Sequence, residues 1–321
     1  MGEGITLISV VMSVYKEPVD WLIQSIDSIL MQTLSDFEFI IICDNPSYGE
    51  GIEILNKYAE KNKRIKLIFN DENIGLTKSL NKGLAVASGK YIARMDADDI
   101  SMPERFEKQI AFMENHPNIG VCGSNIIFFG EKTGEKNYPL EMSDIWLFIE
   151  SPFAHPSVMI RKEALGDSKY DENCIVSQDF NLWVELYSKG VNFANVDAPL
   201  LRYRYSGQQI MSTKANLQIE ISKQVRRKAL KAYYEKKGLN CNFIKENWRI
   251  DFANRIIKDL ELQGNDDVKK QIIYYSFLSI DKSMLYILYA LLFRGYLFRM
   301  CMTDVVMIMY FKLRGIDYSK F

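Results

Sequence analysis

The sequence predicts an α/β fold, with a doubly wound, mostly parallel central sheet and flanking helices, followed by a C-terminal helical region. Two features of the first 130 residues carry this prediction. Short runs rich in apolar and β-branched residues alternate there with segments whose apolar residues recur at helical spacing. The apolar runs also lack a regular alternation of apolar and polar residues, which is typical of strands buried on both faces.

Residues 7–95 follow a β-α-β-α-β-α-β order. The first apolar run, LISVVMSV, is short and has no basic residues before it, so we interpret it as a strand and not as a secretory signal. In the helix that follows, Leu22, Ile26 and Ile29 recur at helical spacing. Gly89 lies where the third helix needs a left-handed cap. The expected strands are 7–14, 37–43, 65–69 and 91–95, and the expected helices are 19–31, 53–61 and 76–87.

The pattern continues less regularly after residue 95. Pro103 suits the first turn of a helix. Residues 131–156 show no clear period and are expected to be irregular. The further expected helices are 103–115 and 179–188, and the further expected strands are 121–129, 191–196 and 200–205. After Gly207 the pattern is helical, basic over 215–262 and then apolar over 272–311.

Composition excludes several classes of protein. The chain has 321 residues, of which 48% are hydrophobic and 25% charged, as in an ordinary globular protein and unlike a disordered or collagen-like chain. Its five cysteines are scattered singly, which favours reduced thiols in a cytosolic protein and argues against a zinc site or a disulfide scaffold. The two histidines are too few for a histidine-rich metal centre.

The net charge of −1 hides an uneven distribution. Residues 1–199 contain 18 Lys and Arg against 30 Asp and Glu, whereas residues 200–321 contain 22 against 11. Such a division suggests two regions that face different partners. The acidic part suits a cation, and the basic part suits an anionic membrane surface or nucleic acid. No nucleic-acid recognition motif is present, so we expect no nucleic-acid partner.

Three carboxylates follow the expected strand 91–95, namely Asp96, Asp98 and Asp99. Ligands of parallel α/β sheets bind beyond the carboxyl ends of the strands, where Tyr15, Glu17 and Asp44 are also expected. A solvated turn, the cap of the next helix or a shared proton would each explain such a cluster. A divalent cation with oxygen ligands would in addition offset the repulsion between the carboxylates.

The surrounding residues resemble bacterial family 2 glycosyltransferases of the GT-A fold, particularly those that build surface or capsular polysaccharides. The resemblance covers about residues 7–206 and is most specific over 70–110, NDENIGLTKSLNKGLAVASGKYIARMDADDISMPERFEKQI. VVMSVYKE (10–17) and IIICDN (40–45) look like the first two strands of that family with their nucleotide-contact loops. DAD (96–98) is similar to its Asp-X-Asp motif.

The resemblance implies a Rossmann-like catalytic domain over 1–206, which binds a nucleotide-sugar through about 1–130 and faces the acceptor through 131–206. Asp98 and Asp96 would hold Mn²⁺ or Mg²⁺, while Asp99 would be either a second metal contact or a structural cap. For Lys78 and Arg94 a solvated or structural role is the alternative to contact with the diphosphate. The implied nucleotide-sugar residues are Tyr15, Glu17, Asp44, Gly75, Lys78, Asn81, Arg94 and Asp96.

Asp179 in VSQDFNLWVEL matches the position at which relatives carry their catalytic base, usually as Glu-Asp, although an N-cap would also explain an Asp here. Gln178 replaces the glutamate of that pair. His155, Gln178, Arg204 and Gln209 are expected on the acceptor or diphosphate side, although a lone histidine such as His155 is more often structural than catalytic. Ser206 stands where many relatives carry a histidine that contacts the metal or diphosphate.

The apolar segment 283–311 is not expected to span a membrane, because its longest uncharged run has 11 residues and a spanning helix needs about 20. Two interpretations remain open for it. It would lie as an interfacial helix on the inner face of the cell membrane, or pack as a helical hairpin on the catalytic domain or on a second subunit of a homodimer.

These features together predict a cytoplasmic, metal-dependent, inverting glycosyltransferase that acts on a nucleotide-sugar. A UDP-hexose is the favoured donor, with dTDP-rhamnose as a second candidate, and the acceptor would be a lipid-linked glycan. A nucleotidyltransferase is an alternative, although SVVMSVYKEPVD lacks the Gly-rich basic loop expected for a triphosphate. A non-catalytic protein that binds nucleotide-sugars or membranes is the other alternative.

Overall fold

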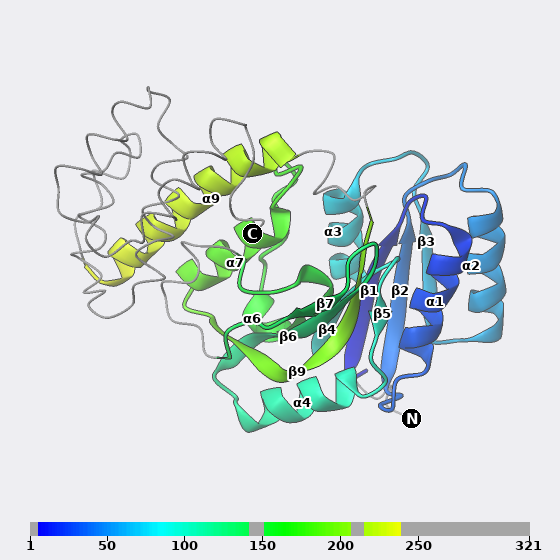
Figure 1. Ribbon diagram of the computed structural model, residues 1–321, viewed down its shortest axis with the longest axis horizontal. Coiled ribbons are helices and arrows are strands. Elements are labelled where there is room, and N and C mark those ends of the chain that lie inside the picture. The colour runs from blue at the N-terminus through cyan, green and yellow to red at the C-terminus, as the bar shows by residue number, and fades with distance from the viewer. Residues whose placement is uncertain (1–5, 141–150, 207–214, 239–321) are drawn as a thin grey trace. The chain divides into compact units, whose positions relative to one another are not determined.

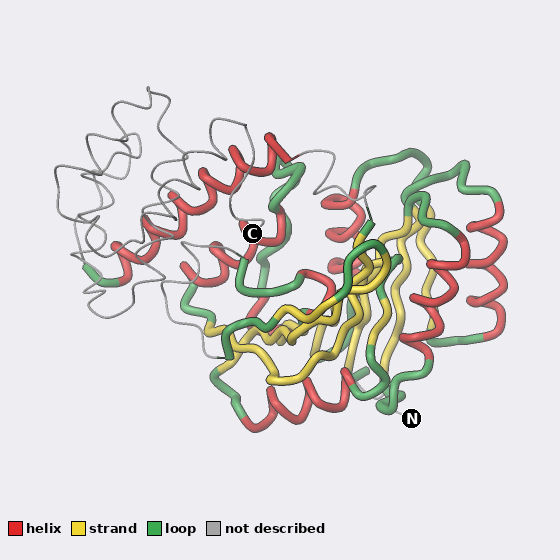
Figure 2. Tube along the Cα trace, in the orientation of Figure 1, coloured by secondary structure: helices red, strands yellow, loops and turns green. Residues whose placement is uncertain are grey.

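The computed structural model describes residues 6–140, 151–206 and 215–238, which form one nine-stranded sheet with helices around it (Figures 1 and 2). Along the sheet the strands are ordered β3-β2-β1-β4-β8-β6-β9-β5, with β7 beside β6. The strands are β1 (Ile8–Val14), β2 (Phe37–Cys43), β3 (Ile65–Phe69), β4 (Tyr91–Asp96), β5 (Ile100–Ser101), β6 (Ile119–Gly130), β7 (Gly134–Lys136), β8 (Met159–Arg161) and β9 (Asn192–Tyr205). The helices are α1 (Val19–Leu30), α2 (Glu50–Lys61), α3 (Leu76–Val86), α4 (Arg105–Asn115), α6 (Lys162–Leu165), α7 (Gln178–Ser188), α9 (Ala215–Lys236) and the 3₁₀ helix η1 (His155–Ser157).

The first four long strands are parallel and confirm the predicted fold class. All seven residues of β1 and of β2 are buried, which explains why neither run alternates between apolar and polar residues. Val14 of β1 pairs with Cys43 of β2, and Ser13 pairs with Asp96 of β4. The carboxyl ends of these strands therefore lie at one edge of the sheet.

Helices cover both faces of this parallel part. On one face, α1, α2 and α4 share a hydrophobic core with alternate residues of β1 and β2, among them Val10, Met12, Phe39 and Ile41. On the other face α3 lies very close to the sheet, and a Cβ atom added to Gly83 would stand only 2.5 Å from Cγ1 of Val11. A glycine is therefore required at this position of the helix.

The second half of the sheet is mixed and differs from the expected strands. The short strand β8 runs antiparallel to both β4 and β6, and its three residues are too few to show a period in the sequence. The two strands expected over 191–205 form one strand, β9, which pairs with β6 and shifts register near Asn125. Pro199 pairs at this irregular point, where a residue without an N–H is tolerated.

Helix α9 is the described part of the basic segment expected to be helical over 215–262. It packs against α7, and its buried residues include Val225, Ala229 and Leu230. It belongs to the same compact unit as the sheet. Among the described helices, none is both long and apolar enough to cross a membrane. The rest of that segment and the apolar segment 283–311 lie outside the described residues.

A buried carboxylate fixes the turn that leads from α3 into β4. Glu38 Oε1 accepts hydrogen bonds from Ser9 Oγ (2.5 Å) and from both the N–H and the Oγ of Ser88 (2.7 Å each), and Lys66 Nζ lies 2.6 Å from Oε2. Burial alone would raise the pKa of Glu38, but these partners outweigh it and lower the pKa to about 2. The ionised carboxylate therefore stabilises the fold.

We predict that Glu38→Gln lowers the free energy of unfolding by about 3 kcal/mol at pH 7, since a pKa lowered from 4.5 to about 2 corresponds to that energy. Because the folded-state pKa is depressed, this contribution is present above about pH 4.5 and disappears as the pH falls toward 2. Urea unfolding at a series of pH values measures it. Exposed Glu60→Gln is the control, expected within about 0.5 kcal/mol of the parent. A deficit that stays constant down to pH 2 would contradict the assignment.

Candidate active site

The carboxylate cluster lies in the turn between β4 and β5, at the carboxyl edge of the parallel strands. Oxygen atoms of Asp96, Asp98 and Asp99 all lie within 4.8 Å of one another. Strand β5 pairs antiparallel with β9, through Ile100 with Arg202 and Ser101 with Leu201, and so pulls the turn toward the second half of the sheet. The three side chains converge because strands on both sides of the turn hold it.

Arg204 on β9 clamps this turn. Its backbone N–H donates to Asp99 Oδ1 (2.7 Å), and its Nε donates to the backbone carbonyl of Asp98 (2.7 Å). Its Nη2 donates to Oε1 of Gln24 on α1 (2.8 Å). The guanidinium also stacks on the rings of Trp21 and Phe129, 4.5 and 4.3 Å from their centroids. Arg204, which the sequence analysis expects on the acceptor or diphosphate side, therefore also holds the turn that carries the carboxylates.

Of the two carboxylate oxygens of Asp99, Oδ1 accepts a hydrogen bond from within the described part of the chain and Oδ2 does not. The residue is only 1% exposed, and its Oδ2 has no hydrogen-bond partner among the described residues. Burial, and then the charges of Asp98 and Asp96, raise the pKa of Asp99 well above its usual value. The cap of α4 is Glu104, so Asp99 does not cap that helix. A buried, unpartnered carboxylate oxygen beside two other carboxylates suits a hard cation such as Mn²⁺ or Mg²⁺.

Arg94 supplies the fixed positive charge beneath the cluster. Its Nη1 lies 2.5 Å from Asp96 Oδ1, and its side chain is 3% exposed against 30% for that of Asp96. Arg204 acts on Asp98 and Asp99 as well, and even two guanidinium groups carry one positive charge fewer than three ionised carboxylates carry negative ones. The sequence left Arg94 between a diphosphate contact and a structural role, and the structure buries it behind Asp96.

Asp44 shapes the loop opposite the cluster. It is 2% exposed, and its Oδ1 accepts from Asn70 Nδ2 (2.8 Å) and the N–H of Ile74 (2.9 Å), while Oδ2 accepts from the N–H of Gly75 (2.8 Å). Gly75 has φ of +87°, which favours glycine, and is the N-cap of α3. The carboxylate at the end of β2 thus holds the loop that precedes α3 against the edge of the sheet.

The loop after β1 presents an aromatic ring at the same edge. Tyr15 is 39% exposed, and its N–H donates to Glu17 Oε2 (2.8 Å), while its carbonyl accepts from Asn45 Nδ2 (2.9 Å). Burial, with a further contribution from Asp96, raises the pKa of Glu17. An exposed ring on a backbone held from two sides is suited to stacking on a planar ligand.

Lys78 and Asn81, the two residues of α3 predicted at the site, differ in their surroundings. Lys78 is exposed and makes no hydrogen bond or ion pair with the described residues. Asn81 instead clamps the backbone of Tyr170, donating from Nδ2 to its carbonyl (2.9 Å) and accepting its N–H at Oδ1 (3.0 Å). Asn81 therefore joins α3 to the segment before α7.

Asp179 brings a fourth carboxylate toward the cluster. It is the second residue of α7, whose N-cap is Ser177 in a left-handed conformation, so Asp179 is not the N-cap. Burial raises the pKa of Asp179; backbone N–H groups and Arg94 partly oppose this rise, and Asp96 adds to it. Asp179 thus lies within electrostatic reach of Arg94 and Asp96, and its raised pKa suits a proton acceptor. Gln178 is buried beside it, and Gln209 lies outside the described residues.

His155 and Tyr170 form a hydrogen-bonded pair near Arg94, with Nε2 of His155 2.8 Å from Oη of Tyr170. Burial, and then the charge of Arg94, lower the pKa of His155 well below 6.5, so the ring is neutral. Sequence reasoning missed Tyr170, and it also missed Tyr203, whose pKa is raised by burial and by Asp99, Asp96 and Asp98. Nothing near either tyrosine in the sequence signals the fold contacts that bring it to the site.

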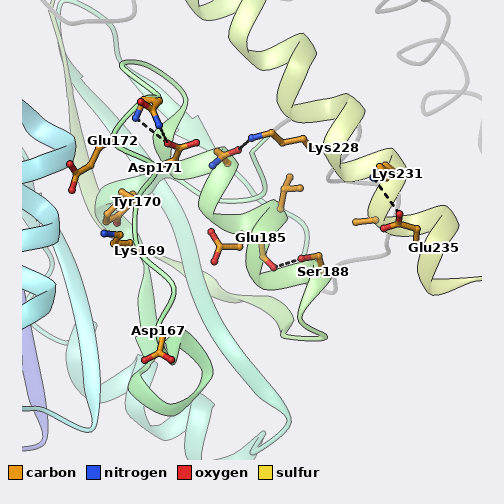
Figure 3. A pocket seen from close by; sticks show the side chains of 14 residues that line it. Asp167, Lys169, Tyr170, Asp171, Glu172, Glu185, Ser188, Lys228, Lys231 and Glu235 are labelled. Atoms are coloured by element: carbon orange, nitrogen blue, oxygen red, sulfur yellow. Dashed lines mark hydrogen bonds and ion pairs between the residues drawn. The ribbon is translucent and has the colours of Figure 1, made fainter. Parts of the chain in front are cut away.

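A polar groove of about 750 Å³ lies between the segment 167–173, α7 and α9 (Figure 3). The carboxylates of the cluster do not line it, whereas Tyr170 does. Its side chains largely bind one another, as Lys228 Nζ donates to Asn181 Oδ1 (2.8 Å) and Lys231 pairs with Glu235 at 3.5 Å. The groove therefore does not include the cluster, but one of its lining residues, Tyr170, lies within electrostatic reach of Asp96.

Comparison with known proteins gives the family. The model of Glycosyl transferase family 2 matches residues 9–168. An uncharacterized glycosyltransferase of Methanocaldococcus jannaschii is 35% identical over 257 residues, which cover 78% of this chain and 87% of that protein. The amylovoran biosynthesis glycosyltransferase AmsE of Erwinia amylovora is 34% identical over 209 residues, 64% of this chain and 78% of its own length.

Solved structures agree at the level of the fold. S. aureus TarS in complex with UDP-GlcNAc has a TM-score of 0.57 at 15% identity, covering 84% of this chain and 90% of that one. The mannosyltransferase PcManGT of Pyrobaculum calidifontis, in complex with GDP-Man and Mn²⁺, has a TM-score of 0.53 at 11% identity, covering 84% and 86%. The chain is a glycosyltransferase and belongs to glycosyl transferase family 2.

Proposed function

We propose that this protein is a metal-dependent, inverting glycosyltransferase that moves a sugar from a nucleotide-sugar to a polysaccharide or oligosaccharide acceptor. The observation that carries the proposal is the cluster of Asp96, Asp98 and Asp99, with the unpartnered buried oxygen of Asp99. The charge of Asp96 also reaches a fourth carboxylate, Asp179 on α7. A UDP-hexose is the favoured donor, with dTDP-rhamnose second. TarS, solved with UDP-GlcNAc, supports a uridine nucleotide, and the Mn²⁺ complex of PcManGT supports the metal.

In the reaction, an acceptor hydroxyl oxygen forms a bond to the anomeric carbon from the side opposite the nucleotide. The bond from that carbon to the diphosphate oxygen breaks, and its electron pair stays on the diphosphate. Asp179 accepts the proton of the attacking hydroxyl. Asp96 and Asp98, with Asp99, would hold Mn²⁺ or Mg²⁺, which when bound neutralises charge on the leaving diphosphate. The leaving group then needs no proton donor.

We further propose that residues 1–206 form the catalytic domain, with nucleotide-sugar binding through about 1–130 and the acceptor side over 131–206. A role in cell-surface polysaccharide synthesis is supported by AmsE and by the O-antigen biosynthesis glycosyltransferase WbnJ of Escherichia coli, 35% identical over 207 residues. The excess of basic residues over 200–321 suits an anionic membrane surface. We therefore propose a cytoplasmic enzyme at the inner face of the membrane with a lipid-linked acceptor.

The test of the metal site is release of the nucleotide from a nucleotide-sugar, measured with Mn²⁺ and after its removal. We expect chelation to abolish release and added Mn²⁺ to restore it, because the cluster then lacks its counter-charge. Asp98→Asn is expected to lower kcat/KM about 100-fold or more, as loss of a metal ligand does. The matched control is Asp36→Asn, an exposed aspartate in the loop before β2. Full activity of Asp98→Asn would refute the metal assignment.

The test of the base is Asp179→Asn. Removing the proton acceptor is expected to lower kcat by about 10²- to 10⁴-fold. The stability gain of the folded protein on adding UDP and Mn²⁺ should remain, because Asp179 is not assigned to nucleotide binding. Thermal unfolding with and without UDP measures that gain. An Asp179→Asn enzyme as fast as the parent would remove Asp179 from the mechanism.

The pH dependence of kcat/KM gives an independent check. Asp179 accepts a proton only when ionised, and burial raises its pKa above 3.8. Activity is therefore expected to fall as the pH is lowered through that raised pKa, with an acid limb above the range of an ordinary aspartate. Initial rates between pH 4 and 8, with unfolding followed in parallel, locate the limb. A rate independent of pH over this whole range would contradict an acidic base.

A further inference from the structure

The pair formed by His155 and Tyr170 is held rigidly beside β4. Tyr170 is 2% exposed, and its backbone is fixed at both polar atoms by Asn81. The ring of His155 meets those of Tyr170 and Trp183 edge to face, at centroid distances of 5.5 and 6.2 Å. Neither ring can turn far without breaking these contacts.

The short helix that carries His155 is also tied to the strand that carries Arg94. The N–H of Arg94 donates to the carbonyl of Val158 (3.0 Å). Buried Arg105 donates from Nη2 to the carbonyls of both Arg94 (2.9 Å) and Val158 (3.2 Å). The imidazole is therefore positioned by the same strand that ends in Asp96.

The number of donors and acceptors left without a hydrogen bond differs between the two tautomers of His155. The bond to Tyr170 is the one hydrogen bond of either side chain within the described part of the chain. If Nε2–H donated to Tyr170, the buried phenol proton and the lone pair of Nδ1 would both lack partners. If the phenol donates to Nε2, only Nδ1–H is left without one. Because a buried hydroxyl that donates no hydrogen bond destabilises the fold, the second arrangement is favoured.

The unpartnered Nδ1–H belongs to a ring that lies among the groups of the candidate site. Arg94 acts on the charge of His155, and Arg94, Asp179 and Asp96 all act on Tyr170. A neutral N–H donor in this position would not compete with Asp179 for a proton. It would add no positive charge beside Arg94, and it could hydrogen-bond an uncharged oxygen such as a sugar hydroxyl.

We propose that His155, fixed by Tyr170 as its Nδ1–H tautomer, donates a hydrogen bond to a hydroxyl of the sugar carried by the nucleotide. Tyr170 is a positioning residue that acts through His155. The assignment to the transferred sugar follows from the attachment of His155 to β4, the strand whose end would hold the diphosphate. This proposal rests on the proposed function, but the state of the imidazole does not.

The state of the imidazole is measured directly by long-range ¹H–¹⁵N NMR at pH 7. The chain contains only two histidines, so His116→Gln leaves His155 as the sole imidazole. We expect a protonated Nδ1 and a bare Nε2, and a mixture of tautomers in Tyr170→Phe. A bare Nδ1, or a doubly protonated ring, in the protein with Tyr170 intact would overturn the proposal whether or not the protein has transferase activity.

Two substitutions then separate the two nitrogen positions. The amide of His155→Asn places an N–H near Nδ1, whereas that of His155→Gln places it near Nε2. The ligand is the nucleotide-sugar that gives the largest thermal shift with the parent protein among UDP-, GDP- and dTDP-sugars. We expect His155→Asn to bind this ligand within about 3-fold of the parent and His155→Gln about 10-fold or more weakly, with binding of the free nucleotide unchanged in both. Tyr170→Phe should also weaken binding of the nucleotide-sugar and raise its KM, but by less than His155→Gln does.

Equal binding by His155→Asn and His155→Gln would overturn the proposal, and so would an equal loss for nucleotide and nucleotide-sugar. Thermal unfolding of each variant identifies losses that come from misfolding, and the matched pair His116→Asn and His116→Gln, at an exposed helix end, should match the parent in every assay. Absence of any turnover or nucleotide-sugar binding by the parent would instead refute the proposed function. The NMR result would still decide the tautomer.

Discussion

Repulsion among three carboxylates in one turn is the constraint on which the rest of the site depends. Asp96, Asp98 and Asp99 are held within 4.8 Å of one another, and Arg94 makes an ion pair with Asp96. The turn keeps this arrangement because Arg204 binds its backbone and one carboxylate from β9. The folded structure thus offsets the repulsion among the carboxylates, and binding of a cation beside them would reduce that repulsion.

The charge of Arg94 acts on residues in both halves of the domain. It lies under Asp96 at the end of the parallel strands, and its charge also reaches Asp179 on α7 and His155 on η1. Burial lowers the pKa of His155 and the charge of Arg94 lowers it further, while the same charge opposes the rise that burial causes in the pKa of Asp179. Buried Arg105 fixes the strand from behind by binding the carbonyl of Arg94. The charge of Arg94 thus influences the pKa values of groups on two other elements, α7 and η1.

Hydrogen bonds of Asp44 and Asn81 join the end of β2, helix α3 and the segment before α7. Asp44 fixes the loop before α3, and Asn81 on α3 fixes the backbone of Tyr170 in the other half. Asp44 and Asn81, two of the residues that the family resemblance assigns to the nucleotide, thus join the end of β2 to the segment before α7 through α3. A disturbance of α3 would reach Tyr170 and His155 through these bonds.

The apolar runs and their helical spacers were sufficient to predict the parallel half of the sheet, because burial on both faces leaves a local pattern in the chain. Asp96 and Asp98 were recognisable for a similar reason, since a strand end and a short motif are both local. The mixed half was not predictable in this way. Strand β8 has three residues, and the single strand β9 is continuous only because it pairs with β6. The clamp by Arg204, the open oxygen of Asp99 and the pairing of His155 with Tyr170 likewise join residues far apart in the chain. Their roles depend on burial and on distances between side chains, which exist only once the sheet has formed.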